Sequence, residues 1–200
     1  MKKLLFACLL LAGCTSGEPF RSILPEDFEL RTGDVVFRRG GGFTSKVVLA
    51  ADVNGEYSHI GIVVDSAGTK MIVHAVPDEP DYEGDKDRVK MEAPEHFFST
   101  EFTLIGEVCR PCDSVIARKA AEVAMRQYRK RVLFDHAYDD TDSTKMYCTE
   151  LIAYAFRQAG RELITGERHT VDLPILKAKC IFPSDIHSSD FLESMIMFHK

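Results

Sequence analysis

Two short β-branched runs, on either side of the polar or small residues 65–68, constrain the fold of this chain more than any other feature. The runs cover residues 59–64 (HIGIVV) and 70–76 (KMIVHAV). Such runs, bounded by turn residues, are typical of strands, so they predict an antiparallel hairpin. If the four joining residues, 65–68, form the loop, His59 lies directly opposite His74, with Cβ atoms about 4.5–5.5 Å apart. A shift of one residue would place the imidazoles on opposite faces.

The other periodic segments predict an α+β domain. We expect strands at residues 35–39, before the glycine triplet 40–42, and near 102–109, and a short helix at 45–51. Asp113 or Ser114 is the expected N-cap of a longer helix that runs to about Lys130. Its apolar stripe comprises Val115, Ile116, Ala120, Val123 and Ala124. Residues 191–198 read as a packing helix or strand.

A second helix is expected from near Tyr147 to Gly160, a residue suited to a left-handed helix end. Leu151, Ile152, Ala155, Phe156 and Ala159 recur at spacings of three and four, so they predict its buried face. Cys148 precedes Ile152 by one turn and lies beside that face at the helix start. The helix dipole and free N–H groups there favour a thiolate. An inert, packed cysteine is the alternative interpretation.

The cysteine and the two histidines together form a candidate catalytic group. Cys148 is the expected nucleophile, His59 the base that takes its proton, and His74 the residue that orients His59. Tyr57 stands two residues before His59 and is a candidate oxyanion donor or site-lining residue, with ordinary packing as the alternative. Glu150 points to another side of the helix, which favours a structural hydrogen bond.

Four segments in order resemble the YiiX/YebB-like cysteine hydrolases, which are NlpC-type enzymes. They are residues 33–38 (GDVVFR), 57–63 (YSHIGIV), 73–77 (VHAVP) and 147–151 (YCTEL). The resemblance implies a circularly permuted papain-like fold, with an antiparallel sheet or small barrel packed against helices. It also implies a Cys148 nucleophile, a His59 base and a polar third residue at His74, where many relatives have glutamate. Cell-wall peptides or acyl compounds are the implied substrates.

Other residues support competing interpretations. The Cys109-Arg-Pro-Cys112 segment fits a dithiol redox site, a structural disulfide or free thiols, and Cys180 is a further pairing candidate. A metal site that combines His59 and His74 with His136 or Asp135 matches no standard zinc spacing. We therefore expect neither a metal nor a cofactor. A non-catalytic binding lipoprotein is the remaining alternative.

The segment before the second helix suggests the surroundings of the candidate site. Residues 134–138 (FDHAY) are expected to line a substrate groove. Asp139, Asp140 and Asp142 follow as an acidic rim, which either attracts substrates that carry an amine or consists of solvated turn residues. The polar stretch 77–88 reads as a surface loop.

The N-terminus carries a secretion signal. Lys2 and Lys3 precede an apolar run that is too short to span a bilayer, and the run ends in Leu-Ala-Gly-Cys at Cys14. This resembles a bacterial lipobox, whose cysteine receives a diacylglycerol. Ordinary secretion or an uncleaved anchor is the alternative interpretation. We therefore expect a signal peptide at 1–13, a lipidated tether at 14–27 and one hydrolase domain at 28–200. The protein would be held at the membrane of the cell envelope by its lipid anchor.

The charge of the chain argues against nucleic acid as a partner. The formal net charge is −6, and loss of Lys2 and Lys3 with the signal peptide makes the mature protein more acidic. No block of arginine and lysine is long enough to follow a phosphate backbone. We expect a peptide or acyl substrate, and the sequence leaves the oligomeric state undetermined.

Overall fold

A computed structural model describes residues 21–53, 55–139, 143–173 and 176–200. The predicted signal peptide and Cys14 lie outside these ranges, as do Asp140 and Asp142. An open antiparallel sheet of six strands forms the centre, in the order β4-β3-β2-β1-β5-β8. The strands are β1 (Val35–Arg39), β2 (His59–Ser66), β3 (Thr69–Val76), β4 (Arg88–Glu92), β5 (Ile105–Pro111) and β8 (Leu192–His199). The sheet does not close into a barrel, the second form expected from the sequence.

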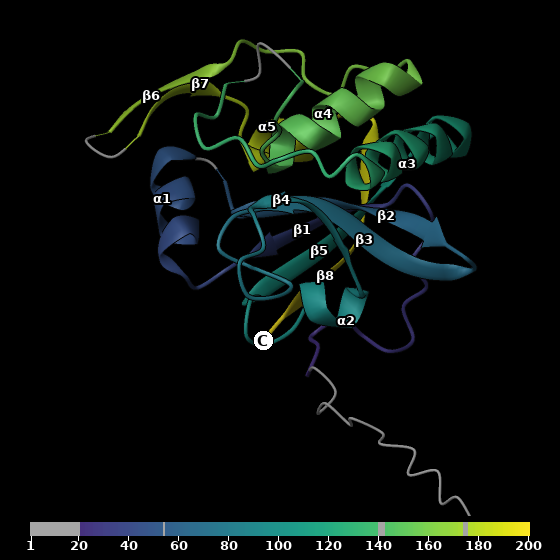
Figure 1. Cartoon of the computed structure of the whole chain (residues 1–200). Coiled ribbons are helices and arrows are strands. Elements are labelled where there is room, and N and C mark those ends of the chain that lie inside the picture. Colours follow the sequence, from purple (N-terminus) through teal and green to yellow (C-terminus); the bar gives the residue numbers. More distant parts are fainter. Residues whose placement is uncertain (1–20, 54, 140–142, 174–175) are drawn as a thin grey trace, which may run out of the picture.

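Helices cover both faces of the sheet, as Figure 1 shows. On one face lie α3 (Ser114–Arg129), α4 (Cys148–Ala159) and the short α5 (Pro183–His187), and on the other lies α2 (Pro94–Phe97). Helix α1 (Phe43–Ala51) sits at one end of the sheet. A separate hairpin is formed by β6 (His169–Leu173) and β7 (Leu176–Cys180). No helix in the described part of the chain has both the length and the apolar character needed to span a bilayer.

Both long helices follow the sequence prediction closely. The Asp113 side chain accepts hydrogen bonds from the backbone of Val115 and Ile116 and caps α3. Helix α4 begins at Cys148 and stops at Gly160, whose φ is +96°. In α3 the predicted stripe is only partly buried, because Val115 is exposed at the helix start.

Strand alternation divides the buried side chains into two cores. Val35, Phe37 and Ile60 belong to the larger core under α3 and α4, whereas Val36 and Val63 belong to the smaller core beside α2. Arg38 pairs with His59 in the β1–β2 register, one residue beyond the Phe37–Ile60 pair. His59 therefore faces the same side as α2.

The β2–β3 hairpin has a tighter turn than the sequence suggested. Ser66 pairs with Thr69, so Ala67 and Gly68 alone form the turn, with φ values of +53° and +87°. Positive φ at both turn residues is the type I′ requirement. The predicted register, with His59 directly opposite His74, is therefore wrong by two residues. Because side chains alternate with a period of two, both histidines still lie on one face.

Candidate functional site

His59 and His74 form a buried pair on the α2 side of the sheet. The Nε2 atom of His59 lies 2.8 Å from the Nδ1 atom of His74. His59 is 8% exposed and His74 is fully buried. Both rings also pack against Phe97 of α2, at centroid distances of 5.7 and 5.3 Å. Gly61 makes room for this pair, since a Cβ atom there would lie 3.3 Å from that of His74.

A carboxylate contacts His74 on the side of the ring away from His59. The Nε2 atom of His74 lies 3.1 Å from Glu92 Oε1, a charge contact without the alignment of a hydrogen bond. His96 of α2 contacts the other carboxylate oxygen. Burial favours a higher pKa for Glu92, but His74, His96 and Arg38 outweigh it and lower that pKa. Glu92 therefore stays ionised and can only accept protons or hydrogen bonds.

The ionised carboxylate assigns the tautomers of both rings. Glu92 favours the proton of His74 on Nε2, which leaves His74 Nδ1 as an acceptor. The Nε2 atom of His59 must then be the donor in the 2.8 Å contact. Nδ1 of His59 is left with a lone pair, and no hydrogen bond joins it to any residue in the described ranges. It is therefore free to act as a base.

The surroundings also keep His59 neutral. Burial, the charge of Arg38 and the neighbouring His74 hold the pKa of His59 well below its usual value of 6.5. The Arg38 guanidinium lies 4.7 Å from the Phe97 ring centre, is 3% exposed as a residue and pairs with Glu79. An imidazole that stays neutral at physiological pH is ready to accept a proton.

Cys148 is the first residue of α4, and its sulfur lies next to the backbone at the start of β2. The backbone N–H of Ile60, the residue after His59, stabilises the Cys148 thiolate, as do the N–H groups of Cys148 and Thr149. Burial is the stronger effect, however, and raises the pKa of the Cys148 thiol to about 11. The resting sulfur is therefore a neutral thiol that needs a base to become a nucleophile.

The cavities next to Cys148 and His59 adjoin. The Cys148 cavity is mainly apolar, with Val48, Tyr138 and Phe182 among its walls. The His59 cavity includes the polar side chains of Arg38 and Glu79. Thr44 and Ser58 line both cavities. Within the described chain no hydrogen bond joins the sulfur to either imidazole ring.

Tyr57, a predicted site-lining residue, and Glu150 both have structural roles. The Tyr57 hydroxyl donates to Glu107, and its ring packs in the larger core against Phe37, on the face away from His59. Glu150 accepts a hydrogen bond from the Tyr147 backbone N–H and caps α4, as predicted. Tyr57 is therefore not available to the histidine pair.

In the 134–138 segment, Tyr138 alone of the described residues lines the Cys148 cavity. Burial and the neighbouring Cys148 raise the pKa of Tyr138 to about 12. The Asp135 carboxylate accepts from the backbone N–H groups of Ala137 and Asp139, which makes it part of the local turn. His136 is exposed and pairs with Asp87, apart from the histidine pair.

Cys109 and Cys112 form no disulfide within the described part of the chain. Cys109 is buried on β5 and Cys112 is exposed after the strand, while Cys180 is buried next to the Cys148 cavity. Burial, followed by the charge of Glu107, raises the pKa of Cys109 far above its ordinary value. A redox-active first cysteine needs a lowered pKa, so the Cys109/Cys112 interpretation loses its chemical basis.

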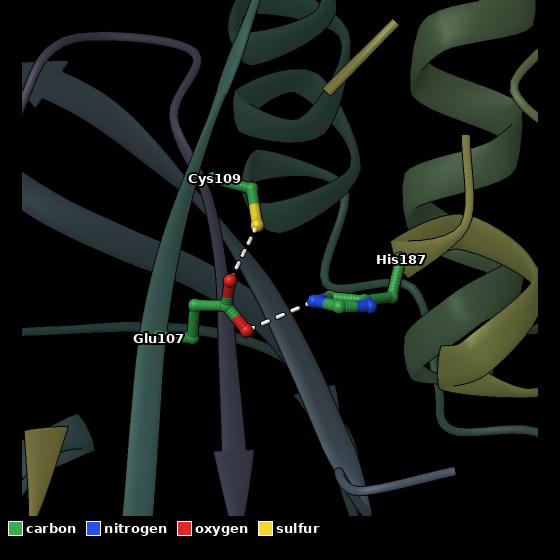
Figure 2. A group of neighbouring side chains, drawn as sticks. All are labelled: Glu107, Cys109 and His187. Atoms are coloured by element: carbon green, nitrogen blue, oxygen red, sulfur yellow. Dashed lines mark hydrogen bonds and ion pairs between the residues drawn. The ribbon is translucent and has the colours of Figure 1, made fainter. Parts of the chain in front are cut away.

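Glu92, Glu107 and His187 are the residues that the sequence analysis missed. Glu92 lies on β4, which was not predicted. Figure 2 shows Glu107 and Cys109 on the same side of β5, with His187 reaching them from α5. Glu107 and Cys109 are two residues apart in a predicted strand, so the sequence could have placed both side chains on one face. His187 is distant in sequence, and no local pattern links it to them.

The fold and the site define an α+β protein with an open antiparallel sheet and a buried pair of histidines, one of which contacts a carboxylate. Among solved structures, the chain resembles YiiX from Escherichia coli O157:H7, whose crystal structure is described as that of a metalloprotein. The TM-score is 0.68 at 18% sequence identity, over 86% of this chain and 100% of YiiX. The fold is thus YiiX-like. Comparisons with family models and with curated protein sequences gave no match.

Proposed function

We propose that this protein is a cysteine hydrolase that cleaves an amide or ester bond through an acyl-enzyme intermediate. One observation carries the proposal: Glu92, His74 and His59 form an oriented series, and His59 lines a cavity that adjoins that of Cys148. A neutral base next to a neutral thiol is the minimum requirement for nucleophilic catalysis by cysteine.

In the first half of the reaction, the Cys148 sulfur attacks the carbonyl carbon while His59 Nδ1 takes the thiol proton. Backbone N–H groups at the start of α4, that of Cys148 first, hold the oxyanion. His59 then gives its proton to the leaving nitrogen or oxygen as the bond to the carbonyl carbon breaks. This leaves a thioester on Cys148.

In the second half, water attacks the thioester while His59 again takes a proton. Collapse of the tetrahedral intermediate returns that proton to the sulfur and releases the carboxylic acid. Throughout, His74 acts as a positioning residue that holds the His59 ring, and Glu92 fixes the tautomer of His74. In a Cys-His-Asp arrangement the carboxylate contacts the base directly. Here His74 lies between the Glu92 carboxylate and the base, His59.

The order of the elements supports a circularly permuted papain-like fold. The histidine strands β2 and β3 precede the cysteine helix α4, which is the order in the YiiX/YebB-like hydrolases that the sequence resembles. The sheet also packs against the helix that starts with the nucleophile. The fold similarity to YiiX supports this assignment at the level of architecture.

The lipobox-like segment that ends at Cys14 supports a location in the cell envelope. A diacylglycerol on Cys14 would tether the domain through residues 15–27, since two acyl chains give stable membrane attachment. A cell-wall peptide or an acyl compound within reach of that surface is the proposed substrate class.

The test uses the mature chain without its lipid and p-nitrophenyl acetate as a general ester probe. We expect a burst of nitrophenol and an acetyl group on Cys148, located by peptide mass spectrometry. Cys148→Ala should abolish both, and His59→Ala should slow acylation by about 10³-fold or more. Cys112→Ala removes an exposed thiol and is the matched control, which should react as the wild type does. Equal acetylation in Cys148→Ala would contradict the proposal.

A further inference from the structure

Three side chains able to bind a metal meet on the α5 side of the sheet, on the face opposite His59. Glu107 and Cys109 point the same way from β5, and His187 reaches them from the end of α5 (Figure 2). Cys109 Sγ lies 3.5 Å from one oxygen of Glu107, and His187 Nε2 lies 2.9 Å from the other. One donor atom from each residue lies within 4.8 Å of the other two.

Glu107 is a buried carboxylate without a strong cation next to it. The residue is 1% exposed, and within the described ranges no lysine or arginine forms an ion pair with it. Its single ionic partner there is His187. Hydrogen bonds from His187, Ser194 and Tyr57 reach its two oxygens. A carboxylate at this depth needs such donors or a cation beside it, because an unbalanced charge in the interior is costly.

Two hydroxyl groups fix the orientation of this carboxylate. The Tyr57 hydroxyl donates to Oε2, and Ser194 Oγ on β8 donates to Oε1. The second acceptor site of each oxygen faces Cys109 or His187, so an ion held by those two residues would take the place of these contacts. Hydrogen-bonded support of a carboxylate is the arrangement found behind metal ligands, where it orients the ligand and tunes its basicity.

Cys109 complements Glu107 in charge. A thiolate next to a carboxylate is unfavourable by itself, because like charges repel. A bound divalent cation reverses this balance, because a coordinating thiol loses its proton. The two anionic donors would then neutralise the two positive charges of the ion, so the buried site would carry no net charge.

We propose that Glu107, Cys109 and His187 form a zinc-binding site. Sulfur, imidazole nitrogen and carboxylate oxygen are the donors that Zn²⁺ takes in proteins, and hard cations such as Mg²⁺ do not use thiolate. A tetrahedral ion requires donors about 3.5 Å apart for sulfur and oxygen and about 3.3 Å apart for nitrogen and oxygen. The observed 3.5 and 2.9 Å contacts reach different oxygens of Glu107, and one donor atom of each residue lies within 4.8 Å of the others, so side-chain rotations would bring the three donors to one ion. The His187 side chain is 37% exposed, which gives the ion access.

The zinc site is separate from the site of the proposed hydrolase. The zinc ligands lie on the face of the sheet away from His59 and His74, and none of them lines the Cys148 or His59 cavity. A bound ion would join α5 to β5. We therefore expect zinc to raise the thermal stability of the protein.

The test uses the full mature chain, stripped with a chelator and then titrated with Zn²⁺, with Mg²⁺ as a second probe. We expect one zinc per chain by elemental analysis after gel filtration, a higher melting temperature with Zn²⁺, and no change with Mg²⁺. Co²⁺ as a spectroscopic probe should show a thiolate-to-metal charge-transfer band that is lost in Cys109→Ser.

Matched variants distinguish this site from adventitious zinc binding. His187→Gln should weaken binding at least tenfold, and Tyr57→Phe should weaken it about tenfold through loss of the oriented carboxylate. His169→Gln changes an exposed histidine on β6 that pairs with Asp185, a residue of α5 like His187. This variant should bind zinc as the wild type does. Because His187 is partly exposed, its variant decides the matter even if Cys109→Ser fails to fold. Unchanged zinc affinity in His187→Gln, or no thiolate band with Co²⁺, would overturn the proposal.

Discussion

His59 Nε2 lies 2.8 Å from His74 Nδ1, and this contact determines the proton positions on both rings. The carboxylate of Glu92 beyond His74 accepts only, so the proton that His74 carries faces Glu92. His59 in turn presents an unprotonated Nδ1. The pair thus supplies an oriented base without a buried carboxylate in direct contact with it, which limits the desolvation cost at the base itself.

Glu92→Gln tests the role of the carboxylate. The amide can donate as well as accept, so it no longer dictates the tautomer of His74, and a fraction of His59 presents the wrong nitrogen. We expect kcat for ester hydrolysis to fall by about 10–10²-fold with little change in KM. Steady-state kinetics measures both. Glu95→Gln on the exposed surface of α2 is the matched control, and an equal loss in that variant would argue against a tautomer effect.

The pH profile tests the state of His59. Its low pKa, caused by burial, Arg38 and His74, means that the ring stays neutral as pH falls past 6.5. The acid limb of kcat/KM, which reports the free enzyme, should therefore lie well below pH 6.5. Arg38→Gln removes a positive charge that disfavours protonation, so the pKa should rise and the limb should move to higher pH.

Arg39→Gln is the control for that shift. Arg39 donates to the Glu56 backbone carbonyl and does not contribute to the pKa of His59. Its profile should match that of the wild type. An acid limb at or above pH 6.5 in the wild type, or an identical shift in both variants, would contradict the assigned base.

Gly61→Ala tests the packing that positions His74. A Cβ atom at Gly61 would lie 2.7 Å from Ile72 Cγ2 and 3.3 Å from His74 Cβ, so neighbouring side chains on β3 must move. We expect the free energy of unfolding to fall by about 1–3 kcal/mol, together with a loss of activity. Denaturant unfolding measures the first. Gly42→Ala meets no atom within 4 Å and should change stability by less than about 0.5 kcal/mol.

Cys14→Ser tests the proposed lipid anchor. Without the thiol no diacylglycerol can be attached, so a membrane-bound protein should move to the soluble fraction of bacterial cells. Cell fractionation and the mass of the mature N-terminus measure the change. Cys8→Ser, which alters a cysteine within the apolar run, should leave the protein at the membrane. Membrane attachment that persists in Cys14→Ser would refute the lipobox assignment.

The sequence predicted the ends of the helices better than it predicted how the strands pair. Asp113 and Gly160 marked the ends of α3 and α4, because capping depends on neighbours in sequence. The register of the hairpin was wrong by two residues, since Ala67 takes positive φ in a turn where asparagine or aspartate is usual. The expectation that both histidines share a face was nevertheless confirmed.

Residues that meet only through the tertiary fold were beyond sequence reasoning. Glu92 reaches His74 because β4 adds to the edge of β3, and neither β4 nor its register was visible as a pattern. His187 reaches Glu107 from an element of five residues, which is too short to show helical periodicity. The Tyr57 hydroxyl, predicted to border the histidine site, instead has its partner on β5, and no local signal in the sequence indicates that contact.

The distance between Cys148 Sγ and His59 Nδ1 in a crystal structure of the wild-type protein tests the central claim most directly. The proposed hydrolase requires this distance to be within about 4 Å, so that proton transfer follows a hydrogen bond or a small rotation of the thiol. A separation well beyond the reach of one bridging water, with the sulfur enclosed by Val48, Tyr138 and Phe182, would contradict it.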